Sequence, residues 1–220
     1  MMFPDLPNTL AVKGVQFKIL GQVFPVLRHD VLGPLSNASL AAAMLRQAPE
    51  GAPADALQQR CQRLSDDVSA MLEEGVGAVR GLEQWLSDDG AVAAAADLLQ
   101  ECRKLVFSQL LLSRRTIRWP EQIAPAELPR FSSRYLALAW LLSLISELAA
   151  DAELELDASE PGVWRARLPQ YAADSAAQPP VITPREVELL AAAAGWRMER
   201  QDRCWSLYLP THLTTGELLP

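Results

Sequence analysis

Residues 27–46, LRHDVLGPLSNASLAAAMLR, decide how the first part of the chain folds. Apolar side chains recur here at spacings of three and four residues, which places them on one face of a helix. The members of this stripe are Leu27, Val31, Leu35, Ala38, Ala42 and Leu45. The pattern predicts a long helix over about residues 10–47, with a kink at the internal Pro25, that packs its stripe against another helix.

A second amphipathic segment follows the turn-forming residues 48–55, APEGAPAD. Its apolar positions alternate spacings of four and three: Leu57, Cys61, Leu64, Val68 and Met71. Two long helices joined by a short turn form an antiparallel hairpin, and a hairpin with a strong apolar stripe needs a partner to cover it. We therefore expect residues 1–87 to be a dimerisation hairpin that forms a four-helix bundle with a second copy.

Residues 88–220 have a different character, because after Ser87–Gly90 helices and strands alternate. Helices are expected at about residues 91–113 and 129–149, and from the N-cap Thr183, with Glu186 in a capping box, to Gly195. Strands are expected at residues 116–119, 152–159 and 162–169, with a closing hairpin of 196–199 and 204–209. Residues 170–180 are predicted to form a mobile loop. The fold class is α+β, with helices on one face of a small sheet.

Composition limits the cellular locations and the classes of partner that are expected for the chain. With 220 residues and 50% hydrophobic content it can bury a real core, and a net charge of −7 argues against nucleic acid as a partner. Three scattered cysteines suggest neither a disulfide framework nor a zinc site. The start of the chain lacks a signal-peptide pattern, and the most apolar stretch, residues 135–150, is shorter than the roughly 20 residues that cross a bilayer. We expect a cytoplasmic protein that does not enter a membrane.

His29 is the strongest candidate for chemistry. The other histidine, His212, stands in a polar tail and is interpreted as a solvated loop residue. On a helix His29 lies about 200° around the axis from Val31 in the apolar stripe, so its ring should face solvent. Imidazole can present an unprotonated, nucleophilic nitrogen near neutral pH, and Asp30 could hydrogen-bond the other nitrogen or act as a base.

The pattern His-Asp-x-x-x-Pro at residues 29–34, on the first helix of a hairpin, resembles the phosphoacceptor box of sensor histidine kinases. It also resembles that of the dimeric histidine phosphotransferases derived from these kinases. Residues 138–169 resemble the helix and strand pair of the kinase ATP-binding domain, and residues 185–210 resemble its closing helix and hairpin. The resemblance implies that residues 88–220 form a small ATPase-like α/β sandwich.

The second half departs from the kinase pattern where ATP would bind. Glu147 falls where the family has its magnesium-coordinating asparagine, and Ser143 falls where it has an earlier asparagine. Residues 170–180, QYAADSAAQPP, stand where a glycine-rich stretch would cradle the phosphates. We therefore expect a degenerate ATPase domain without a cofactor, with Mg²⁺ supplied only by a partner receiver domain.

The resemblance implies a histidine phosphotransfer protein of a two-component phosphorelay. In it His29, supported by Asp30, would pass a phosphoryl group between the aspartates of response-regulator receiver domains, with a hybrid kinase as a further candidate partner. The partner-docking residues would be Arg28, Gly33, Ser36 and Asn37. Gly33 replaces the polar residue that kinases with phosphatase activity carry there, which makes that activity doubtful. Two alternatives stay open: a non-catalytic pseudokinase or adaptor that dimerises and binds a response regulator, and an unrelated α+β protein in which His29 is incidental.

Overall fold

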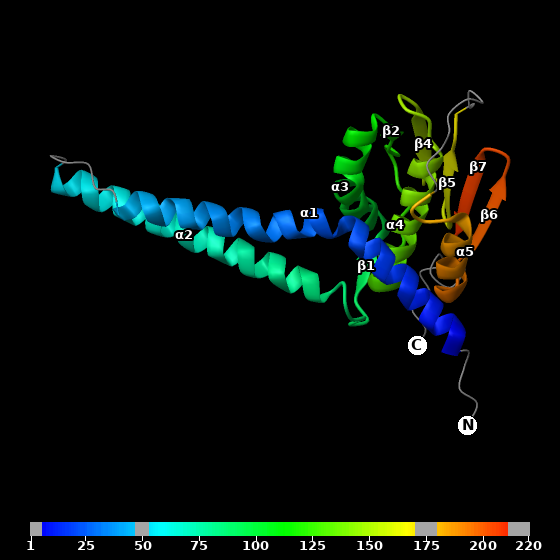
Figure 1. The fold of residues 1–220 in the computed structure, drawn as a ribbon, viewed down its shortest axis with the longest axis horizontal. Coiled ribbons are helices and arrows are strands. Elements are labelled where there is room, and N and C mark those ends of the chain that lie inside the picture. The colour runs from blue at the N-terminus through cyan, green and yellow to red at the C-terminus, as the bar shows by residue number, and fades with distance from the viewer. Residues whose placement is uncertain (1–5, 47–52, 170–179, 211–220) are drawn as a thin grey trace. The chain divides into compact units, whose positions relative to one another are not determined.

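The computed structural model of the chain describes residues 6–46, 53–169 and 180–210 (Figure 1). His212 and nearly all of the loop predicted at residues 170–180 lie outside these ranges. The chain divides into two compact units, residues 24–87 and residues 1–23 together with 88–220. One division falls after Ser87. The first 23 residues, which the sequence pattern had placed with the hairpin, instead belong to the same unit as the C-terminal part.

The hairpin unit consists of two long helices, as predicted. Helix α1 spans Leu6–Arg46 and is helical through Pro25 and Pro34, and α2 spans Ala54–Glu83. Small or compact residues, Pro34, Ala38 and Ala41 on α1 and Gly75 on α2, are buried in the hairpin. A Cβ placed on Gly75 would lie 3.2 Å from Cδ2 of Leu35, so the two helices approach closely at this level.

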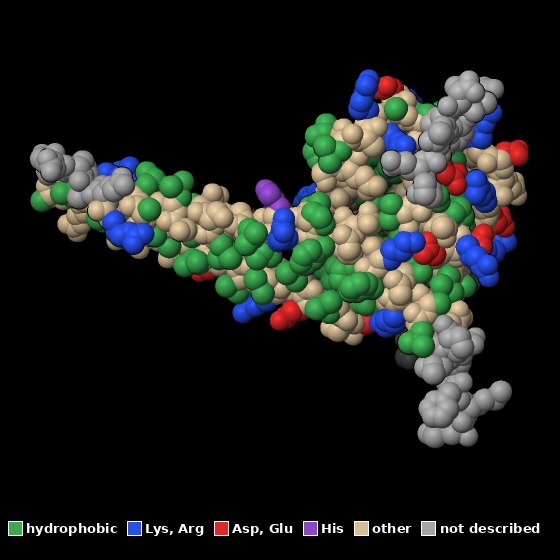
Figure 2. Space-filling view, viewed as in Figure 1, with side chains coloured by type: hydrophobic (Ala, Val, Ile, Leu, Met, Phe, Trp, Pro, Cys, Tyr) green, Lys and Arg blue, Asp and Glu red, His purple; other side chains and the backbone are tan. Residues whose placement is uncertain are grey.

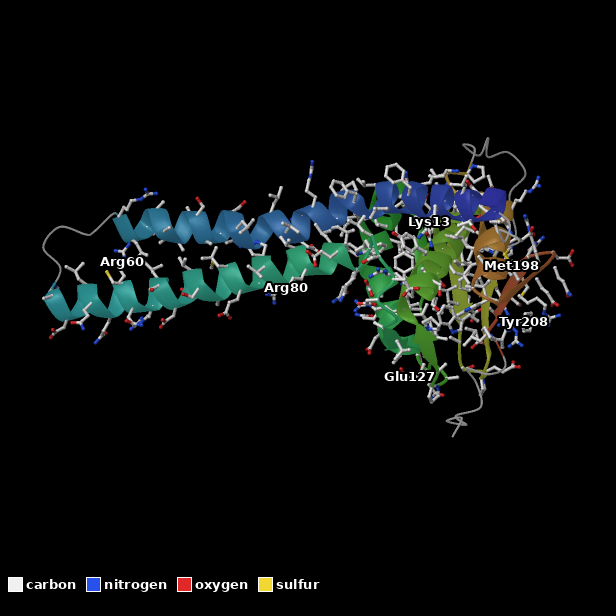
Figure 3. All side chains as sticks on the ribbon, turned by 90° about the horizontal axis from the view of Figure 1, so that it is seen from below. Lys13, Arg60, Arg80, Glu127, Met198 and Tyr208 are labelled. Carbon is white, nitrogen blue, oxygen red and sulfur yellow. The ribbon has the colours of Figure 1, made fainter. Side chains whose placement is uncertain are left out.

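The second unit is α+β, and the predicted fold class is confirmed. Its elements are β1 (Val92–Ala94), α3 (Ala95–Ser113), β2 (Thr116–Arg118), β3 (Glu127–Pro129), α4 (Arg130–Glu147), β4 (Glu153–Asp157), β5 (Val163–Arg167), α5 (Pro184–Ala193), β6 (Arg197–Gln201) and β7 (Cys204–Tyr208). The main sheet has the order β2-β4-β5-β7-β6, in which only β2 and β4 run parallel. Figure 3 shows Met198 on β6 and Tyr208 on β7, the strands of the closing hairpin.

The two faces of the main sheet differ because apolar and polar residues alternate along its strands. The inward side chains include Leu154 and Leu156 of β4, Trp164 of β5 and Trp205 of β7, and all of them are buried. The alternate positions, such as Glu155 and Arg167, lie on the other face, where the two side chains pair at 3.6 Å. The helices α3, α4 and α5 lie on the apolar face (Figure 1). Helix α4 is at the centre of this layer, since nearly every residue from Phe131 to Ile145 is buried.

The first part of α1 completes this unit. Val15, Ile19 and Val23 repeat at a spacing of four and are buried. Lys18 forms an ion pair of 2.8 Å with Glu186 on α5, and the ammonium of Lys13 lies 5.3 Å from the centre of the Phe131 ring on α4 (Figure 3). Helix α5 begins as predicted, because the Thr183 side chain accepts a hydrogen bond from the Glu186 backbone and Glu186 accepts one from the Thr183 backbone.

Two features differ from the sequence-based expectations. The helix predicted from residue 91 begins at Ala95, because Val92–Ala94 pair as strand β1 with β3 in a second, two-stranded sheet. In addition α1, from Asn8 to Arg46, is long and apolar enough to cross a membrane by length and composition, although residues 135–150 had been taken as the most apolar stretch. Buried core helices of soluble proteins and signal sequences meet the same criterion, and 22% of the apolar window of α1 is buried.

Candidate functional site

His29 lies on α1 within the hairpin unit, and its side chain is 85% exposed. This exposure agrees with the helical phase, because the buried positions Pro34 and Ala38 fall about 140° and 180° around the helix from His29. A macromolecular partner can therefore reach the ring without any rearrangement of the hairpin.

Asp30 is the acidic neighbour of this imidazole. Its Oδ1 lies 3.6 Å from Nδ1 of His29, which is longer than a hydrogen bond, and its side chain is 63% exposed. The carboxylate therefore lies beside the ring without a hydrogen bond to it. Because Nδ1 is the nitrogen on the Asp30 side, Nε2 is the nitrogen directed away from the carboxylate and open to solvent.

The predicted docking residues surround His29 to different degrees. Ser36 and Gly33 lie within about 40° of His29 around the helix, so they share its face. Asn37 lies about 80° to one side and Arg28 about 100° to the other, on the shoulders of that face. Arg28, Ser36 and Asn37 are exposed and Gly33 is half-buried, and a side chain added at Gly33 would meet no atom within 4 Å. The face around His29 is therefore open, with the charged Arg28 and Asp30 on its two shoulders.

Two leucines on this face were missed by the sequence reasoning. Leu32 is 50% exposed and Leu40 is 63% exposed, and both lie within about 60° of His29 around α1. They stand outside the six-membered apolar stripe, and the spacing of four from Leu32 through Ser36 to Leu40 was the available signal. A partner that reached His29 would meet apolar surface beside it.

The hairpin also exposes apolar side chains away from His29. Leu72, Val76 and Val79 follow one another on α2 at spacings of four and three, and each is about half exposed, at 46%, 50% and 45%. Leu35, predicted as a core position, is 40% exposed, and Cys61, predicted in the seam of the second helix, is also exposed. One hairpin therefore leaves part of its seam uncovered, because two helices cannot enclose all the apolar positions of both stripes.

The positions compared with the kinase nucleotide site lie at the end of α4. Ser143 is fully buried, and Glu147 forms an ion pair of 3.2 Å with Arg200 of β6. The Arg200 guanidinium also lies 4.7 Å from the centre of the Trp205 ring. Burial raises the pKa of Glu147 above its usual value, although Arg200 acts in the opposite direction. Within the described ranges, no three His, Cys, Asp or Glu side chains gather in a way that could hold a metal ion.

Comparison of the sequence with protein families and with curated proteins finds no match. Among solved structures, the cytoplasmic segment of the histidine kinase QseC is similar with a TM-score of 0.42 and 11% identity, over 55% of this chain and 78% of that one. The Acinetobacter baumannii histidine kinase AdeS is similar with a TM-score of 0.39 and 11% identity, over 86% and 98% of the two chains. The histidine kinase ThkA in complex with the response regulator protein TrrA has a TM-score of 0.39 at 11% identity, over 96% and 68%. Similarity of this extent carries no argument about chemistry, which rests on the residues described above.

Proposed function

We propose that this chain is a histidine phosphotransfer protein of two-component signalling, which accepts and passes a phosphoryl group through His29 without using ATP. The observation that carries the proposal is the position of His29. It is an exposed imidazole on a helical hairpin, with a carboxylate 3.6 Å from one ring nitrogen and the other nitrogen free toward solvent. The His-Asp-x-x-x-Pro spacing at residues 29–34 supports the same chemistry.

The transfer step follows from the two ring nitrogens. The unprotonated Nε2 of His29 attacks the phosphorus of an aspartyl phosphate on a receiver domain, and an N–P bond forms as the bond from phosphorus to the carboxyl oxygen breaks. The receiver aspartate leaves as a carboxylate, and the ring keeps its proton on Nδ1, where Asp30 offsets the positive charge that develops. The reverse step, onto another receiver, transfers the same phosphoryl group. Mg²⁺ would belong to the receiver site.

The absence of an ATP-dependent step is part of the proposal. Glu147, the position compared with the kinase's metal-binding asparagine, already has Arg200 as its cationic partner at 3.2 Å. A carboxylate neutralised by a guanidinium is a poor ligand for a hydrated Mg²⁺ ion, which needs oxygen donors in a fixed octahedral arrangement. The buried Ser143 offers no accessible ligand in its place. The phosphoryl group would therefore have to come from a response regulator or a hybrid kinase.

A homodimer is the second part of the proposal. The half-exposed Leu72, Val76 and Val79 of α2, with Leu35 of α1, provide an apolar surface that a second hairpin would cover in a four-helix bundle. Leu32 and Leu40 lie on the His29 side of α1 and would remain available to a receiver domain together with Arg28, Ser36 and Asn37. Such a protein would act in the cytoplasm, without membrane or nucleic acid.

The test is a transfer assay with purified full-length chain and a receiver domain carrying labelled phosphate. The expected result is acid-labile, base-stable label on the chain, lost in His29→Ala and retained in His212→Ala, the matched change at the other histidine. Asp30→Asn should slow the transfer without abolishing it. Label that survives in His29→Ala, or no label from any receiver tried, would contradict the proposal.

A non-catalytic adaptor is the second candidate, and one observation favours it. The His29 ring forms no hydrogen bond with Asp30 at 3.6 Å, so its tautomer is not fixed by that contact. An adaptor would bind receiver domains equally well before and after His29→Ala and would never carry label. Binding measured by calorimetry, beside the transfer assay, separates the two functions.

A further inference from the structure

The outer face of α3 carries large apolar side chains that the fold leaves exposed. Phe107 is 62% and Leu111 is 67% exposed, and they lie one turn apart on the same face of the helix. In Figure 2 a group of hydrophobic side chains stands over the outer side of this helix. A concentration of this kind marks a contact surface more often than isolated exposed leucines do.

This face is also hollowed. A pocket of about 230 Å³ lies between the C-terminal half of α3 and the segment of β2 that follows it. Phe107, Leu110 and Leu111 line it from the helix, and Ile117 and Trp119 line it from the strand side. The surface is therefore a short apolar groove with an aromatic wall, a shape that accepts protruding side chains of another molecule.

The groove is positively charged, in a chain of net charge −7. Arg103 and Arg115 line it and no acidic side chain does. Arg103 lies 5.7 Å from the centre of the Trp119 ring, and Nε of Arg115 is buried without a hydrogen-bond partner. Throughout the parts of the chain that the structure describes, neither arginine forms an ion pair. Both are consequently available to an anionic partner.

We propose that this groove docks an amphipathic helix of a partner protein whose polar flanks are acidic. Along α3 the groove positions from Arg103 to Leu111 extend for about 12 Å, and Arg115 follows just past the helix end. This length matches about two turns of a partner helix with anchors at i, i+4 and i+7. Acidic flanks on that helix would pair with Arg103 and Arg115, which form no ion pair within the described residues.

Two other occupants fit the charges less well. An anionic bilayer would also have to meet Arg114 and Arg118 beside the groove. Arg114 pairs with Asp151 at 2.9 Å and Arg118 pairs with Glu153 at 2.7 Å, so the charges of these two arginines are already neutralised. A second copy of this chain, docked by the same face, would bring arginine against arginine, because the groove has no acid of its own. The proposal concerns the α3 face and is independent of the role of His29.

The test uses the full chain and a fluorescent helical peptide of about 15 residues with leucine anchors and glutamate flanks. We expect saturable binding that weakens with salt, falls about tenfold or more in Leu111→Asp and in Arg103→Glu, and persists in His29→Ala. The matched controls are Leu10→Asp, a leucine that is 63% exposed on α1, and Arg185→Glu on α5, and both should bind as the unaltered chain does. A peptide with lysine in place of glutamate should bind at least tenfold more weakly.

Three results would overturn the proposal. The first is no saturable binding, or equal losses in Leu111→Asp and Leu10→Asp. The second is that the chain does not bind the peptide but binds vesicles of phosphatidylglycerol, and that Leu111→Asp abolishes the vesicle binding. The third is self-association of the chain, measured by sedimentation, that Leu111→Asp abolishes. Circular dichroism of each variant establishes that the fold is retained, and Arg103→Glu provides the same test without changing an apolar residue.

Discussion

Two glycines on α2 provide a matched test of how closely the hairpin helices pack. A Cβ on Gly77 would meet nothing within 4 Å, whereas a Cβ on Gly75 would lie 3.2 Å from Cδ2 and 3.5 Å from Cγ of Leu35. Replacing a helical glycine with alanine stabilises a helix by about 1 kcal/mol when there is room for the methyl group. Gly77→Ala should therefore raise the free energy of unfolding by about 1 kcal/mol.

Gly75→Ala gains the same helix propensity but has to displace Leu35, and overpacking costs about 1–3 kcal/mol. Because Leu35 is 40% exposed and can partly turn away, we expect the lower end of that cost. The free energy of unfolding of Gly75→Ala should thus lie about 1 kcal/mol below that of Gly77→Ala. Adding Leu35→Ala removes the obstacle, so in that background the two alanine substitutions should become equivalent.

Urea unfolding followed by circular dichroism gives these free energies, and hydrogen exchange of the α2 amides assigns the change to the hairpin in case the two units unfold separately. Equal stabilisation by Gly75→Ala and Gly77→Ala in the unaltered background would refute the close approach of the helices at Gly75. A difference that persists after Leu35→Ala would show that another contact of Gly75 is responsible.

Three further predictions concern the second unit. Glu101→Gln should lower the free energy of unfolding by about 3 kcal/mol, because it removes the carboxylate that lies 3.3 Å from the guanidinium of Arg134, a side chain that is 1% exposed. The half-exposed control Glu155→Gln should change the free energy of unfolding by less than about 1 kcal/mol in the same urea titration. Burial acts to raise the pKa of Glu186, but hydrogen bonds from Lys18 and Thr183 outweigh it and hold that pKa below the ordinary 4.5. The group therefore stabilises the fold above pH 4.5 and the contribution is lost as pH falls through the lowered value, so Lys18→Met should flatten the acid limb of a stability-against-pH curve. Finally, burial raises the pKa of the Cys102 thiol far above its usual value, so in native protein a maleimide should label the exposed Cys61 and leave Cys102 unlabelled until urea is added.

The parts of the fold that were predicted from the sequence have local causes. The exposure of His29 follows from the helical period alone, and the start of α5 follows from Thr183 and Glu186, which lie three residues apart. Strand β1 was missed because Val92–Ala94 has no pattern of its own and is a strand only through its partner β3. The role of Val15, Ile19 and Val23 was misplaced for a related reason. Their spacing shows that one face of the helix is buried, but it does not show against which part of the chain.

In the candidate site, too, the features with local causes were predicted and those that depend on distant contacts were not. His29, Asp30 and their exposed neighbours are close in sequence, so a helix was sufficient to place them. The pair of Glu147 and Arg200 joins residues 53 positions apart, and the groove beside α3 combines Phe107 with Trp119 across a turn. No local pattern predicts such contacts, since they depend on how strands and helices pack.

The ion pair between Lys18 and Glu186 has a consequence for folding during synthesis of the protein. Lys18 is synthesised 168 residues before Glu186. At a synthesis rate of about 5–20 residues per second, the interval between the two residues is on the order of ten to thirty seconds. The hairpin, residues 24–87, is synthesised entirely within that interval and can form first. The apolar face of Val15, Ile19 and Val23 meanwhile lacks residues 88–220, the rest of its own unit, and stays exposed until they are synthesised.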